Sequence, residues 1–88
     1  MFTKLTIGVT EQQLIYRQVD RTSYVIFNNS AANTLYIGEK GQGTNGFPIK
    51  PLGSISFKIP EDDTTGELWG IASGAGTDIR IYEGYGLG

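Results

Sequence analysis

The chain has 88 residues and a formal net charge of −2, and it contains neither histidine nor cysteine. This length predicts one domain with a thin hydrophobic core, and the lack of cysteine excludes disulfide bonds as its support. The missing residue types also remove the commonest general base, the thiol nucleophile and the usual zinc ligands. We therefore expect a non-enzymatic protein without a metal or cofactor, and a small hydrolase is the least favoured alternative.

The seven basic residues are scattered along the chain and form no run or stripe. Nucleic-acid binding requires several phosphates to be neutralised together, so we expect no nucleic-acid partner. The opening stretch, MFTKLTIGVTEQQ, alternates polar and apolar residues. We expect neither a signal peptide nor a membrane-spanning helix, and no membrane partner. A cysteine-free chain is suited to assembly in a reducing cytoplasm.

The first half of the chain alternates in a way that predicts strands. Residues 4–10 place three apolar side chains on one face, namely Leu5, Ile7 and Val9. Residues 13–19 are rich in strand-forming side chains, with a less regular pattern. A short helix over residues 10–18 stays open as an alternative, because Thr10 and Gln13 resemble a capping box.

Residues 23–29 predict a strand that is apolar on both faces, with Tyr24 and Ile26 on one side and Val25 and Phe27 on the other. That pattern indicates a central strand, or a strand with one face covered by another subunit. The polar turn NNSAAN joins it to a second strand at 34–38, as in a hairpin. The residues that follow, EKGQGTNGF, are expected to form a loop.

The second half predicts strands at 54–60, 66–72 and 78–84. The first directs Ile55, Phe57 and Ile59 inward, and the last directs Ile79 and Ile81 inward and Arg80 and Tyr82 outward. SGAGTD at 73–78 is expected to be a hairpin loop. KPLGS at 50–54 favours a turn looser than type II, since the glycine follows one position late.

About seven or eight short strands at this spacing predict an all-β fold, a single small antiparallel β-sandwich over residues 1–88. The thirteen glycines agree with many tight turns. Residues 83–88, EGYGLG, could form a flexible C-terminal arm that docks on another subunit through Tyr85 and Leu87; a frayed terminus is the alternative.

Two loops deserve comparison with known sites. GQGTNG at 41–46 resembles a phosphate loop, but FPIKPLG follows and cannot start the helix that such a loop needs, so we expect no phosphate site. Glu61, Asp62 and Asp63 could hold a hard cation, although they lack the spacing of a calcium loop. A solvated turn is the favoured interpretation.

Exposed aromatic residues mark binding surfaces for proteins or sugars. Trp69 lies opposite Leu68 if Leu68 faces inward, and Tyr36 and Tyr82 are expected on strand faces with solvated hydroxyls. The favoured interpretation of Trp69 is nevertheless a position at the edge of a thin core, and the same interpretation applies to Tyr36 and Tyr82. The candidate partner contacts are therefore Tyr36, Trp69, Tyr82, Tyr85 and Leu87.

Three segments, RTSYVIFNNSAANTLYIGE, NGFPIKPLGSISFKIP and GELWGIASGAGTDIRIYEG, together resemble a family of small virion proteins of tailed bacteriophages. The resemblance spans residues 21–84. It implies a jelly-roll-like sandwich in the phage particle, either a capsid decoration (cement) protein or a head-fibre or tail module. It also implies structural roles for the residues that define its turns and last strand: Asn28, Asn29, Gly38, Pro51, Gly53, Asp78 and Arg80, the last two as an ion pair.

The favoured function is thus a capsid decoration protein that binds the major capsid protein lattice and also itself, a trimer being the favoured oligomer. Its expected location is the virion. The alternative is a receptor- or glycan-binding module of a fibre or tail, with Trp69 or Tyr36 stacking on a host sugar.

Overall fold

The computed structural model describes residues 1–58 and 62–85. Within these ranges the chain forms eight strands and one short 3₁₀ turn, η1 (Gly43–Asn45). The strands are β1 (Phe2–Ile7), β2 (Gln12–Ile15), β3 (Ser23–Asn28), β4 (Leu35–Gly38), β5 (Phe47–Ile49), β6 (Ser54–Lys58), β7 (Leu68–Ala72) and β8 (Thr77–Gly84).

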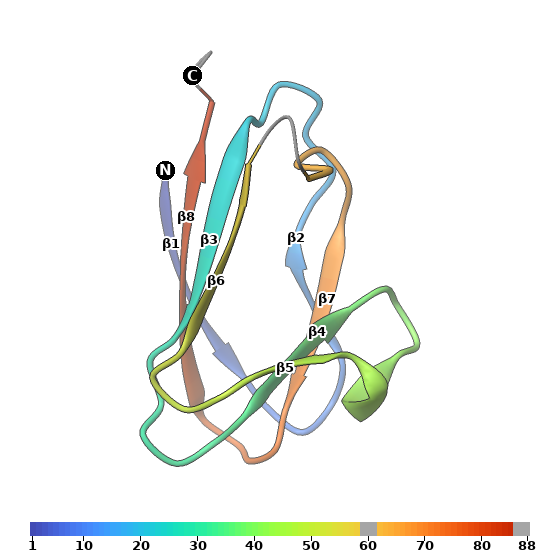
Figure 1. Cartoon of the computed structure of the whole chain (residues 1–88). Coiled ribbons are helices and arrows are strands. Elements are labelled where there is room, and N and C mark those ends of the chain that lie inside the picture. The colour runs from blue at the N-terminus through green and yellow to red at the C-terminus, as the bar shows by residue number, and fades with distance from the viewer. Residues whose placement is uncertain (59–61, 86–88) are drawn as a thin grey trace.

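The strands form two antiparallel sheets of four, which face each other as two layers (Figure 1). The first sheet has the order β1-β8-β3-β6 and the second has the order β2-β7-β4-β5. Two interlocked Greek keys produce this order, which is that of a jelly roll. The predicted all-β, jelly-roll-like sandwich is therefore confirmed.

The predicted hairpins are wrong. β3 and β4 lie in different sheets, and so do β7 and β8. Among the eight described strands, only β4 and β5 follow each other in the chain and also pair. The turn residues between the other strands permit a crossing from one layer to the other as readily as a reversal within one layer, so local turn chemistry could not distinguish the two.

The first two strands are shorter than predicted. β1 ends at Ile7, and the carbonyl of Gly8 accepts the Ala72 N–H at 2.9 Å, which carries the chain toward the second sheet. Val9 is therefore 60 % exposed, and its predicted place beside Leu5 and Ile7 is wrong.

Residues 12–15 form a strand, so the helical alternative over residues 10–18 is wrong. The register between β2 and β7 shifts between Gln13 and Ile15. A bulge of this kind turns adjacent side chains to the same side, and Leu14 and Ile15 are both buried. The bulge explains why the alternation in this segment is irregular.

The predicted loop after β4 contains η1 and the beginning of β5. β5 is an edge strand, which is where a strand tolerates Pro48. In the next turn the Gly53 N–H donates to the Lys50 carbonyl at 2.8 Å, and Leu52 has a φ of 61°. These features match a type II turn, so the looser turn expected from the sequence is wrong.

The core lies between the sheets. Its buried apolar side chains are Ile7, Leu14, Ile15, Tyr24, Ile26, Leu35, Ile37, Ile49, Ala72, Ile79 and Ile81. Leu5, Ile55, Phe57 and Leu68 pack against this cluster, and the rings of Tyr24 and Phe57 stack 4.7 Å apart. The inward directions predicted for β6 and β8 are confirmed, except for Ile59, which lies outside the described residues.

One end of the sandwich is closed by a clamp around Arg21, whose side chain is 1 % exposed. Its guanidinium donates to the carbonyls of Thr64, Tyr16 and Gly66 and, at 2.8 Å, to the carboxylate of Glu83. The Thr64 hydroxyl donates back to the Arg21 carbonyl at 2.6 Å. A buried charge is tolerated only when it is paired and hydrogen-bonded. Through Glu83, this network holds β8 against residues 16–21 and residues 64–66.

The opposite end is held by Asn28, which is fully buried. Its side-chain amide donates to the carbonyls of Asn33, Ile49 and Lys50, and its side-chain oxygen accepts the Ser30 N–H. The residue thus shapes its turn, as expected, and also ties that turn to the end of β5 and to Lys50 after it.

Candidate interaction surface

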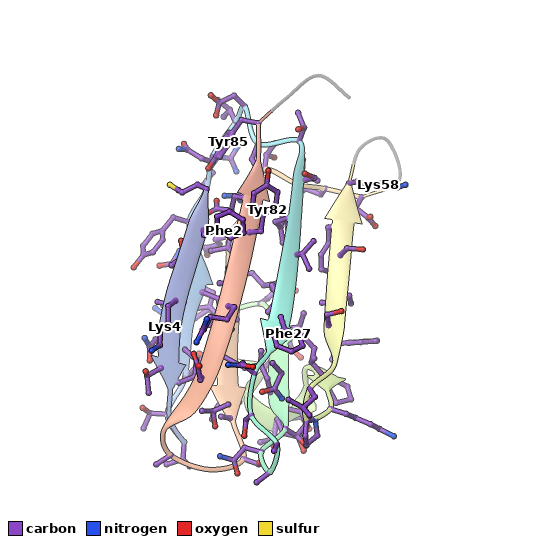
Figure 2. All side chains as sticks on the ribbon, turned by 90° about the vertical axis from the view of Figure 1, so that its left-hand side faces the viewer. Phe2, Lys4, Phe27, Lys58, Tyr82 and Tyr85 are labelled. Atoms are coloured by element: carbon purple, nitrogen blue, oxygen red, sulfur yellow. The ribbon has the colours of Figure 1, made fainter. Side chains whose placement is uncertain are left out.

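The outer face of the first sheet is called the open face below. Alternation along the four strands directs onto it Phe2, Lys4, Thr6, Ser23, Val25, Phe27, Ser54, Ser56, Lys58, Asp78, Arg80 and Tyr82. Figure 2 views this face, with Phe2 and Tyr82 toward the upper ends of β1 and β8 and Phe27 lower down on β3. Because the opposite faces of the same strands build the core, every apolar side chain here lies outside the core.

The apolar part of the open face crosses three strands. Phe2 is opposite Tyr82 in the β1–β8 register, and Tyr82 is opposite Val25 in the β8–β3 register. The rings of Phe2 and Tyr82 lie 4.7 Å apart at a tilt of 47°. A shallow pocket of about 590 Å³ lies here, lined mainly by Phe2, Tyr82, Val25, Phe27, Lys4 and Arg80.

A charged row lies one pleat further along the strands. Lys4 is opposite Arg80 in the ladder, and Arg80 is opposite Phe27. Arg80 donates through Nε and Nη2 to the Asp78 carboxylate, at 3.1 and 2.9 Å, so the expected Asp78–Arg80 pair is confirmed. The hydrogen bond from Arg80, with a second from Asn29, lowers the pKa of Asp78 to about 2.

The outer face of the second sheet, called the covered face, carries Trp69, Ile71, Tyr36 and Pro48. Tyr36 is opposite both Ile71 and Pro48. Residues 39–46 pack against this face: the Lys40 ammonium lies 5.0 Å from the centre of the Trp69 ring, and Gln42 packs where a side chain on Gly38 would lie. The Trp69 indole Nε1 is buried, without an acceptor among the described residues.

The glycine-rich loop is fastened by Glu11. The Glu11 carboxylate accepts the Gly41 N–H at 2.8 and 2.9 Å and the Gly43 N–H at 3.3 Å. Both glycines have positive φ, and the N–H of Gln42 between them donates to the Glu39 carbonyl. The N–H groups of Gly41 and Gly43 are thus occupied by a carboxylate of the same chain, in a loop for which the sequence predicts no phosphate site.

A cleft of about 520 Å³ opens between the sheets beside β1 and β2. The Arg21–Glu83 pair forms part of its lining, and the Tyr85 hydroxyl donates to Glu83 at 3.1 Å. Because Glu83 accepts from both neighbours, its carboxylate acts as a structural anchor here.

The structure describes four of the five residues singled out from the sequence, and it places them on different surfaces. Tyr82 is on the open face, Tyr36 and Trp69 are on the covered face, Tyr85 is in the cleft, and Leu87 lies outside the described residues. Trp69 lies on the face of β7 that points away from the core, and not at the edge of the core. Sequence reasoning missed Phe2, because the first strand was predicted to begin two residues later.

The two described residues of the acidic run, Asp62 and Asp63, accept hydrogen bonds from residues close to them in the chain. Asp62 accepts the Lys58 N–H, and Asp63 accepts both the N–H and the hydroxyl of Thr65. The Thr65 hydrogen bonds lower the pKa of Asp63. Glu61 lies outside the described residues, and residues 1–58 and 62–85 hold no cluster of three or more potential metal ligands.

In the described part of the chain, no helix is long and apolar enough to cross a membrane. No family model, no curated protein and no solved structure matches the chain.

Proposed function

We propose that this chain is a non-enzymatic structural protein of a tailed-phage virion, a decoration protein that binds the major capsid protein lattice and stabilises the head. The proposal starts from the resemblance of residues 21–84 to small phage virion proteins. It places the protein in the virion after assembly in the host cytoplasm.

The open face is the observation that carries the proposal. Phe2 is 84 % exposed and Tyr82 is 43 % exposed, and their rings lie side by side on the neighbouring strands β1 and β8. Soluble monomers rarely leave a contiguous apolar patch of this kind uncovered unless it binds something. A jelly roll of 88 residues with one such face is suited to attachment on a larger assembly.

Many equal contacts would explain how so small a protein stabilises a shell. Each copy contributes a modest interface, and the contributions of copies at equivalent lattice sites add up, so weak individual contacts suffice. A trimer would multiply the contact of each attached unit in the same way.

The test is a binding experiment with expanded capsids of the source phage that lack this chain. We expect saturation at a fixed number of copies per capsid and a higher capsid melting temperature. Light scattering of the protein alone determines whether it is a trimer. Binding to host cells or their polysaccharide without binding to capsids would overturn the proposal in favour of a receptor- or glycan-binding module.

A further inference from the structure

We propose that the open face is the surface through which the protein binds its partner, and that the partner is a protein surface in which apolar side chains are flanked by carboxylates. This inference rests on the proposed function, since it identifies the chemistry of the contact that a decoration protein would make.

The first step is the distribution of charge. The four strands direct three basic side chains (Lys4, Lys58 and Arg80) and one acidic side chain (Asp78) onto the open face, a net charge of +2. The whole chain carries −2, so the rest of the chain carries −4. The open face is therefore basic in an otherwise acidic protein, and it attracts partners of the opposite sign.

The second step is the position of Lys4 and Arg80 directly opposite each other in the β1–β8 ladder. Like charges at directly opposed positions destabilise a sheet. Asp78 compensates Arg80 through Nε and Nη2, and Lys4 has no ion pair among the described residues. A carboxylate above Lys4 and Arg80 would meet the Lys4 ammonium and the outer edge of the guanidinium, and would relieve their repulsion.

The third step is the shape of the surface beside these charges. The pocket of about 590 Å³ joins the apolar side chains of Phe2, Tyr82, Val25 and Phe27 to Lys4 and Arg80 in one concavity. It can receive a protruding apolar side chain of a partner while a neighbouring carboxylate reaches the basic pair. Membrane surfaces are instead bound by amphipathic helices or lipid anchors, whereas the open face belongs to a sheet. The concavity therefore favours a protein partner.

A second copy of the chain fits the same face poorly. An isologous contact places this face against itself. It would bring two Lys4–Arg80 pairs into one interface, with only the two Asp78 carboxylates between them. The charge pattern thus favours a different, acidic surface.

The experiment compares four single variants with the wild type for binding to expanded capsids that lack the protein. Phe2→Ser and Lys4→Glu change the open face at exposed positions. Phe47→Ser and Lys50→Glu are the matched controls, since both residues are exposed and lie outside the open face. Far-UV circular dichroism checks that each variant is folded.

We expect Phe2→Ser and Lys4→Glu each to weaken binding by about tenfold or more, as substitutions at the centre of an interface do, and the controls to bind like the wild type. Raising the salt concentration from about 0.05 M to about 0.5 M should weaken wild-type binding and affect Lys4→Glu less.

The outcomes separate the two proposals. If the wild type does not bind capsids, the proposed function fails. If it binds and both open-face variants bind equally well, the function survives and the assignment of the face is overturned. A wild-type dimer that Phe2→Ser converts to a monomer, or binding to anionic vesicles that Phe2→Ser abolishes, would also overturn it, with a second copy or a membrane as the occupant.

Discussion

The two outer faces of the sandwich both carry apolar side chains, but these differ in how far the chain itself covers them. Each carries aromatic and aliphatic side chains at the outward positions of its strands. On the covered face, residues 39–46 of the chain itself pack beside Trp69 and Gly38, with Lys40 above the Trp69 ring. On the open face, Phe2 and Tyr82 stay exposed. Alternation alone therefore does not distinguish an apolar face that stabilises the monomer from one that is free to bind a partner.

The largest loss of stability is expected for substitution of Arg21, which closes one end of the sandwich between the two sheets. Arg21→Met would leave the Glu83 carboxylate, 12 % exposed, without its cation and three carbonyls without their donor. The loss of one partner of a buried pair costs about 3–5 kcal/mol of unfolding free energy. Urea denaturation measures this cost. Arg80→Met on the open face is the control and should change stability little, because its side chain is 50 % exposed.

The comparison of the faces is tested directly by removing one aromatic side chain from each. Trp69→Ala should lower the free energy of unfolding by about 3 kcal/mol, because the ring is packed beneath the loop. Phe2→Ala should change it by less than about 0.5 kcal/mol. Equal losses in thermal and urea denaturation would show that the two faces do not differ in this way.

A smaller effect is expected at the Glu11 fastening. Glu11→Gln keeps the side-chain shape and weakens the charge-assisted bonds to the Gly41 and Gly43 amides, so the unfolding free energy should fall by about 1 kcal/mol. Faster hydrogen exchange at these two amides, with unchanged exchange in β3 and β8, would locate the loosening at the covered face. Unchanged exchange at both amides would contradict the fastening.

The smallest effect concerns pH on the open face. The pKa of Asp78 is lowered to about 2 by Arg80 and Asn29, so its contribution to stability is present above the ordinary pKa near 3.8 and is lost as the pH falls toward 2. Asp78→Asn should therefore flatten the dependence of melting temperature on pH between these values. A slope equal to that of the wild type would show that the carboxylate is not stabilised by its neighbours.

The sequence predicted the fold class because alternation is strong in β6 and β8, where inward and outward residues are clearly distinct. It could not predict the strand partners. The same short turns permit a hairpin or a crossing between layers, and the choice depends on contacts between distant residues, such as those of Asn28 and Arg21.

The candidate surface was predictable in part. The two apolar faces of residues 23–27 indicated either a central strand or a covered face, and β3 is in fact central, with Val25 and Phe27 on the open face. The separation of Tyr82 from Trp69 and Tyr36 onto opposite faces was not predictable, because it follows from which sheet each strand joins.

Trp69 is the only tryptophan of the chain, and it lies on the covered face beneath Lys40. Its fluorescence emission is therefore an intrinsic optical reporter of the loop over that face, remote from Phe2 and Tyr82. Docking on the open face would leave the emission wavelength unchanged, whereas lifting of residues 39–46 would shift it to the red. The emission of one unlabelled sample can thus show whether binding at the open face also moves the loop over the covered face.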